Sequence, residues 1–221
     1  MNVLVIGASR GIGLEFVRQY RADGAAVSAT ARDDAGLERL KALGATALRL
    51  DVADAASASG LGAQIEGAVF DVAIVNAGVS GERVAPLEPP SVANFDVVMH
   101  TNVLGPMRVL PQIAEVLAPG AKLALLSSRM GSIGGRTSAS SSLYRASKAA
   151  VNSVLKDAAL TLGTRAACVA FHPGWVRTDM GGAGADIDVA TSVAGMRNVI
   201  AALKPDETGV YRSYDGEVIP W

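Results

Sequence analysis

Tyr144 and Lys148 are the residues of this 221-residue chain whose types and spacing most directly suggest catalysis. They stand four positions apart, so in a helix they share one face, with Cβ atoms about 5–6 Å apart. A phenol with a pKa near ~10 is a poor acid or base at neutral pH, but an ammonium ~4–5 Å away stabilises the phenolate by roughly 3–4 kcal/mol. The pair predicts a tyrosine acid/base, although a core-edge tyrosine beside a solvent-reaching lysine fits the same spacing.

A helix is predicted around this pair, beginning near Ser142 and running beyond Asn152. An apolar stripe continues the face that carries the pair, because its members recur at helical spacing. The stripe consists of Val151, Leu155, Ala158 and Leu162. We expect the pair to lie where the buried face of this helix opens onto a cleft.

A glycine-rich turn follows the first apolar run, residues 3–6, and leads into a helical pattern that reaches Arg21. Such a turn lets the backbone approach a pyrophosphate, whose charge is met by the N–H groups at the start of the helix. The spacing G-x3-G-x-G differs from the best-known dinucleotide pattern, and an ordinary strand-to-helix turn fits it too. The expected cofactor contacts in this turn are Gly7, Ser9, Arg10, Gly11, Ile12 and Gly13.

Arg32 ends the second apolar run, about 20 residues after the glycine turn, where an acid would indicate an NAD ribose site. Together with Arg10 it offers guanidinium groups suited to a 2′-phosphate, which favours NADP. Asp33 and Asp34 are rival ribose ligands, but they directly precede an apolar helical pattern and are more simply its N-terminal cap.

Apolar runs alternate with helical patterns along the chain, which predicts right-handed crossovers and a parallel sheet. We expect one α/β domain over residues 1–221, a Rossmann-like doubly wound sheet with helices on both faces. Ligands bind such sheets at the carboxyl ends of the strands. The expected strands are residues 3–6, 25–31, 45–50, 71–75, 122–126, 165–171 and a short one at 209–212. The glycine turn, Asp51 and Asn76 to Gly78 all fall at such strand ends.

Pro106 interrupts a long helical pattern over residues 91–117. Proline has no N–H for the carbonyl of Asn102, so that oxygen is expected to lose its helical partner. The freed carbonyl could hold a water in the site, or the proline could simply kink the helix around the sheet.

Composition excludes several classes of protein. Half of the residues are hydrophobic and 19% are charged, with 20 basic and 21 acidic residues and a net charge of -1. No basic run indicates a nucleic-acid or membrane surface, and no apolar run reaches the length of a membrane span. Cys168 is the single cysteine and lies in an apolar run, which predicts a buried thiol and no metal site. Without a secretory leader the protein is expected to be cytoplasmic, with a small-molecule partner.

By its motifs the chain resembles the short-chain dehydrogenase/reductase superfamily over nearly its whole length. Those motifs are the glycine turn, Asn76-Ala77-Gly78, Ser128 upstream of Tyr144-x3-Lys148, and Pro173-Gly174. Stretches near Ser128, at 144–148 and at 172–181, with the Ile-Pro-Trp ending, are most similar to C-factor/sniffer-type carbonyl reductases. Two positions depart from the family pattern: Ile6 stands where threonine is usual, and Val75 replaces an asparagine.

The resemblance implies roles for individual residues. Ser128 would bind the substrate oxygen, Tyr144 would donate the proton, Lys148 would bind the nicotinamide ribose, and Asn102 would hold a water. The remaining cofactor contacts that it implies are Asp51, Val52, Asn76, Ala77, Gly78, Pro173, Gly174, Val176 and Thr178. His100 and His172 are expected to be structural, because this chemistry needs neither.

The expected function is NADPH-dependent interconversion of a carbonyl and an alcohol. An NADP-binding regulatory or signalling protein with little catalysis is the alternative. Sugar-nucleotide epimerase or dehydratase chemistry fits less well, because little chain follows Thr178 to build a substrate subdomain. The substrate pocket is expected from residues 79–85, 129–143 and 175–187, and the resemblance implies a homodimer or homotetramer paired through residues 105–118 and 146–163.

Overall fold

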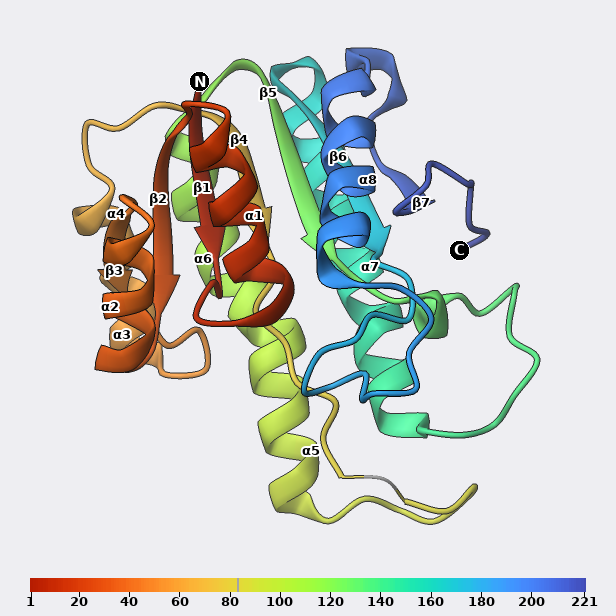
Figure 1. The fold of residues 1–221 in the computed structure, drawn as a ribbon. Coiled ribbons are helices and arrows are strands. Elements are labelled where there is room, and N and C mark those ends of the chain that lie inside the picture. The colour runs from red at the N-terminus through yellow and green to blue at the C-terminus, as the bar shows by residue number, and fades with distance from the viewer. Residues whose placement is uncertain (83) are drawn as a thin grey trace.

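A seven-stranded sheet forms the centre of the computed structural model, which describes residues 1–82 and 84–221 (Figure 1). Each strand is parallel to its neighbours, in the order β3-β2-β1-β4-β5-β6-β7. The strands are β1 (Asn2–Ile6), β2 (Ala26–Ala31), β3 (Thr46–Arg49), β4 (Phe70–Val75), β5 (Leu117–Leu126), β6 (Ala166–His172) and β7 (Val210–Ser213). The predicted doubly wound α/β fold is confirmed, and β5 begins five residues earlier than expected.

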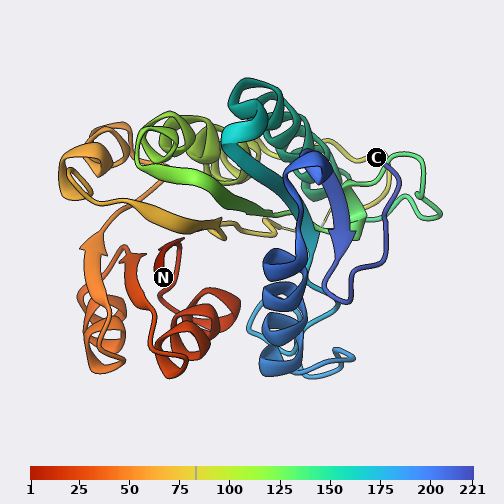
Figure 2. The ribbon, with the colours of Figure 1, turned by 90° about the horizontal axis from the view of Figure 1, so that it is seen from above.

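Helices cover both faces of the sheet (Figure 2). One face carries α1 (Gly11–Ala22), α2 (Asp34–Ala42) and α8 (Val189–Ala202). The other carries α3 (Ala55–Ser59), α4 (Leu61–Gln64), α6 (Gly105–Glu115) and α7 (Ser142–Leu162). In the described part of the chain, no helix has the length and apolar character that crossing a membrane requires.

The sheet separates two hydrophobic cores, and β1 contributes to both. Leu4 and Ile6 pack into the core beneath α6 and α7, whereas Val3 and Val5 pack into the core beneath α1 and α8. Because successive side chains of a strand point to opposite faces, a strand buried on both sides reads as a continuous apolar run. This is why the short runs of the sequence were recognisable as central strands.

The long helical pattern before β5 is divided into three parts, and the interruption that the sequence predicts at Pro106 lies just before the proline. A π-helical segment, His100–Leu104, separates α5 (Val92–Met99) from α6. The Gly105 N–H donates to the carbonyl of His100, five residues back. Pro106 has no N–H to donate to the carbonyl four residues before it, so an α-helical turn would lose that hydrogen bond. The chain forms the wider π-helical turn there instead.

Helix α7 packs its apolar stripe against the sheet, as predicted. Leu155 is completely buried, Val151 and Leu162 are nearly so, and Ala158 is partly buried. The helix is 21 residues long and extends ten residues beyond Asn152. Its packing fixes the position of Tyr144 and Lys148 at its N-terminal end.

Leu155→Ala should lower the free energy of unfolding by about 2–5 kcal/mol, because the variant leaves a cavity beneath α7. Asp157→Ala, an exposed change on the same helix, is the matched control and should stay within about 0.5 kcal/mol of the wild type. Urea denaturation followed by circular dichroism measures both variants. Equal losses would contradict the placement of the stripe in the core.

Candidate cofactor and active site

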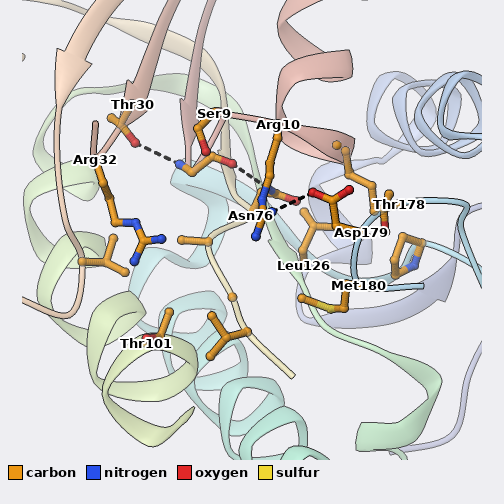
Figure 3. A pocket seen from close by; sticks show the side chains of 18 of the residues that line it. Ser9, Arg10, Thr30, Arg32, Asn76, Thr101, Leu126, Thr178, Asp179 and Met180 are labelled. Carbon is orange, nitrogen blue, oxygen red and sulfur yellow. Dashed lines mark hydrogen bonds and ion pairs between the residues drawn. The ribbon is translucent and has the colours of Figure 1, made fainter. Parts of the chain in front are cut away.

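A groove of about 350 Å³ opens at the carboxyl ends of the central strands (Figure 3). It brings together most of the residues that the sequence singles out: Gly7, Ser9, Arg10, Gly11, Ile12, Arg32, Asp51, Val52, Asn76, Ala77, Gly78, Tyr144, Lys148, Pro173 and Thr178. Gly13, Asn102, Ser128, Gly174 and Val176 are not part of its lining. Gly13 lies behind the glycine turn, where a Cβ would come within 2.2 Å of the Gly7 carbonyl oxygen. The other four lie behind or beside the wall.

The glycine turn lies directly against the end of β4. Gly7 has a φ of 83°, and a Cβ there would lie 2.7 Å from the Cα of Ala77, so only glycine fits. Its N–H donates to Thr30 Oγ1 at 2.9 Å, and its carbonyl accepts from Asn76 Nδ2 at 2.6 Å. The turn therefore has strong side-chain partners although Ile6 and Val75 depart from the family pattern.

Arginines surround the end of the groove near β2. Arg32 extends from the strand end into the groove, and Arg10 reaches across it to Asp179, with an N–O distance of 2.7 Å (Figure 3). A third arginine, Arg39, donates to the carbonyl of Ser9 at 2.9 Å. Phosphate is an appropriate ligand for such a cluster.

The two rival ribose ligands are engaged elsewhere. Asp33 caps α2 by accepting a hydrogen bond from Gly36 N–H at 2.6 Å, as predicted. Asp34 forms an ion pair with Arg49, the last residue of β3. Asp51 lines the groove, and its Oδ1 accepts from the Ala53 N–H at 2.9 Å.

Lys148 is buried at the centre of the groove wall, 5% exposed. Its Nζ donates to the carbonyl of Leu126 at 2.8 Å and lies 5.7 Å from the centre of the Tyr144 ring. An ammonium has three N–H donors, and within residues 1–82 and 84–221 we find one hydrogen bond from this group. A Cβ on Gly78 would lie 3.4 Å from Nζ, so glycine leaves the space beside it open. The remaining donors fit the hydroxyls of a ribose.

Burial changes the pKa of both members of the pair. It raises the pKa of Tyr144 to about 12, an effect that hydrogen bonding with Ser128 partly offsets. It lowers the pKa of Lys148 to about 8, because the charged ammonium is desolvated. Lys148 is not among the causes of this change in the Tyr144 pKa, so the lowering of that pKa by Lys148 stays a prediction.

Ser128 follows β5 and is buried beside the groove. Its backbone is extended, and its Oγ accepts a hydrogen bond from the Met130 N–H at 3.2 Å, which leaves its O–H free to donate. The serine begins a single 3-10 turn, Arg129–Gly131, that packs against α7. A Cβ on Gly131 would lie 2.8 Å from the Lys148 carbonyl, so this close packing requires glycine.

Asn102 is fully buried in the π-helical segment, and its side chain is completely hydrogen-bonded. Its Oδ1 accepts from the Val79 N–H at 2.8 Å, while its Nδ2 donates to the Val79 carbonyl at 2.8 Å and to Ser147 Oγ at 3.0 Å. The side chain thus ties the end of β4 to α7. The predicted water on its backbone carbonyl stays a prediction.

The segment after β6 covers the other end of the groove. Gly174 has a φ of 85°, and a Cβ there would lie 3.2 Å from the ring of Tyr214. Val176 is buried and pairs with Ile187 in an isolated parallel bridge, which positions Thr178 on the groove wall. Gly174 and Val176 therefore shape the segment from behind.

The two histidines do not line the groove. His100 is exposed in the π-helical segment. Burial, together with the positive charge of Arg129, lowers the pKa of His172 to about 4. Cys168 is buried, as predicted, and burial raises the pKa of its thiol to about 11.

Sequence reasoning missed several lining residues. The most informative are Thr30, Thr101, Leu126 and Ser127. Thr30 stands one residue before the end of β2 and Ser127 one residue after the end of β5, so inspecting the residues around each strand end would have found them. Of the expected substrate walls, Val79 and residues 177–180 line the groove, and Arg83 lies outside the described residues.

Comparison with known proteins places the chain in a family. The sequence profile described as short chain dehydrogenase matches residues 1–186. The C-signal protein of Myxococcus xanthus is 40% identical over 154 residues, which cover 68% of this chain and 92% of that protein. A short-chain dehydrogenase/reductase from Burkholderia multivorans, crystallised with bound NADP, has a TM-score of 0.91 at 32% identity, covering 100% of this chain and 99% of that one. The carbonyl reductase Sniffer of D. melanogaster has a TM-score of 0.91 at 29% identity, with the same coverage.

Lys148→Met should remove a pH dependence of stability. Unfolding restores the usual lysine pKa, so above pH 8 the unfolded wild type binds more protons than the folded one and its stability rises with pH. The wild type should gain up to about 2 kcal/mol relative to this variant between pH 8 and pH 10. Urea titrations at several pH values measure the difference, with the exposed Lys156→Met as control. A constant difference would contradict the burial of the ammonium.

Proposed function

Because this chain belongs to the short chain dehydrogenase family, we propose that it is an NADP-dependent oxidoreductase that interconverts a carbonyl and an alcohol. One observation supports this above all: Tyr144 and Lys148 stand in the same groove as the glycine turn. The turn offers N–H groups and a helix N-terminus to a pyrophosphate, and the pair offers a proton donor where the nicotinamide would end.

In this mechanism the bound NADPH supplies the hydride. The Ser128 hydroxyl donates a hydrogen bond to the carbonyl oxygen, on which negative charge develops as the reaction proceeds. Tyr144 donates its proton to the same oxygen. Lys148 holds the ribose hydroxyls with the N–H donors that Leu126 does not use, and Asn102 keeps the Val79 turn in place.

Carbonyl reduction requires Tyr144 in its protonated form. Burial raises the pKa of Tyr144 to about 12, so the phenol carries the proton that the developing alkoxide needs at neutral pH.

The arginines near β2 support NADP as the cofactor. Arg32 lines the groove, and both neighbouring aspartates have partners within the protein, since Asp33 caps α2 and Asp34 pairs with Arg49. The Burkholderia multivorans protein, which has the same fold, was crystallised with bound NADP. Similarity to the carbonyl reductase Sniffer supports a carbonyl substrate.

A regulatory or signalling role is the second candidate. It draws on the 40% identity to the C-signal protein. The complete set of Ser128, Tyr144, Lys148 and Asn102 favours catalysis, because a protein that only bound NADP would not need it.

We also propose a cytoplasmic homodimer. Met107 on α6 and Leu160 on α7 are 50% and 72% exposed, and an apolar contact between copies would cover them. The single buried cysteine and the balanced charge are typical of a cytoplasmic protein.

Tyr144→Phe should lower kcat for carbonyl reduction by roughly 10²–10⁴-fold, because it removes the proton donor and leaves the ring in place. NADPH binding should be unchanged, since the phenylalanine keeps the groove wall. The rate of NADPH oxidation with a panel of aldehydes and ketones measures turnover, and NADPH fluorescence measures cofactor binding. Wild-type turnover in this variant would exclude Tyr144 as the donor.

Arg32→Ala should weaken NADPH binding by about tenfold or more while leaving NADH binding nearly unchanged, because it removes a charged hydrogen-bond donor to the 2′-phosphate. Arg165→Ala, a change at an exposed arginine outside the groove, is the control. Dissociation constants from fluorescence titration compare the two cofactors. Equal weakening of both would overturn the assignment of NADP to this arginine.

A further inference from the structure

Tyr211 is a buried phenol beside the active site that the proposed mechanism does not use. It lies in β7, at the far edge of the sheet from the glycine turn, and is 2% exposed. Its O–H donates to the backbone carbonyl of Ser128, 83 residues away in sequence. The same carbonyl accepts the Gly131 N–H at 2.7 Å, so two donors hold it.

Other polar groups surround the hydroxyl of Tyr211. Burial raises the pKa of Tyr211, and the nearby polar side chains of Ser127 and Asn152 partly offset this effect. Asn152 is buried in α7, and by strict geometry its amide nitrogen and oxygen lack a partner among the residues described.

The last residues of the chain hold Tyr211 from the other side. The ring of Trp221 stacks on the Tyr211 ring, with centroids 5.2 Å apart, and the Ile219 N–H donates to the Tyr211 carbonyl at 2.9 Å. The Trp221 carbonyl accepts the Ile133 N–H at 2.6 Å, and the Pro220 carbonyl accepts the Ser132 hydroxyl. Residues 219–221 therefore join β7 to the segment that follows Ser128.

We propose that Tyr211, held by Trp221, is a positioning residue for Ser128. Its hydroxyl fixes the Ser128 carbonyl, and with it the extended backbone that directs Ser128 Oγ to the substrate. Ser128 is the second residue after β5, and the segment of 129–136 beyond it is largely exposed. Tyr211 gives the Ser128 carbonyl a second donor, from β7, in addition to the Gly131 N–H that the segment itself supplies. A hydroxyl that serves only folding would stabilise the protein without a specific effect on Ser128.

Tyr211→Phe tests the proposal directly, because the Gly131 N–H still satisfies the Ser128 carbonyl and the variant keeps its fold. Tyr20→Phe is the matched control, since it removes another buried phenol hydroxyl, on α1 beside Arg197. Hydrogen exchange followed by mass spectrometry should show faster exchange over residues 128–136 in Tyr211→Phe and no change there in Tyr20→Phe. Trp221→Ala should show the same local effect. Unchanged exchange over residues 128–136 in both Tyr211→Phe and Trp221→Ala overturns the proposal, whatever the activity of the protein.

A double-mutant cycle tests the catalytic consequence, which depends on the proposed carbonyl reduction. Tyr211→Phe should lower kcat about tenfold with the KM for NADPH unchanged, because a displaced Ser128 stabilises the developing charge less well. In a Ser128→Ala background the same change should cost less than about twofold. Equal losses in the two backgrounds overturn the positioning role. Absence of any wild-type turnover contradicts the proposed function instead, and the exchange measurement then still decides the role of Tyr211.

Discussion

The burial of the Lys148 ammonium is the constraint on which the rest of the site depends. Removing a charge from water is costly unless hydrogen bonds replace its hydration. Here the Leu126 carbonyl at the end of β5 provides one bond, and two glycines without side chains, Gly78 and Gly131, allow the strand ends to close around α7. The pKa of Lys148 is lowered because this single hydrogen bond does not fully replace the lost hydration of the ammonium. A site that holds a cation with unused donors is prepared for a ligand rich in hydroxyl groups.

The same helix is tied to the sheet by neutral hydrogen bonds. Asn102 joins the turn after β4 to Ser147 on α7, and Ser147 in turn donates to the carbonyl of Tyr144 at 2.8 Å. The π-helical segment around Asn102 exists because Pro106 withdraws one N–H donor from the helix. One proline therefore affects both the course of the helix and the place from which Asn102 reaches the site.

The sequence was sufficient to predict the features that depend on local pattern. Apolar runs and glycines identified the parallel sheet, the glycine turn and the groove, and Asp33 was recognised as a helix cap from its place before an apolar helix. Features that depend on distant contacts were not predictable. The pKa of Tyr144 is governed by how deeply the finished fold buries it, and the hydrogen bond from Tyr211 to Ser128 joins residues that no local pattern connects. The π-helical segment was missed because the proline indicates a break without indicating its geometry.

Arg10 and Arg32 were expected to share the 2′-phosphate, but the structure makes them unequal. Arg10 already has a carboxylate partner in Asp179, and both side chains of this pair are more than 70% exposed. Binding a phosphate through Arg10 would require it to leave or share that partner, whereas we find no such competing ion pair for Arg32 in the part of the chain that the structure describes. An exposed ion pair contributes little stability by itself. Its larger effect is to connect the glycine turn to the segment after β6 across the mouth of the groove, which leaves Arg32 as the arginine whose charge is available for choosing between the two nicotinamide cofactors.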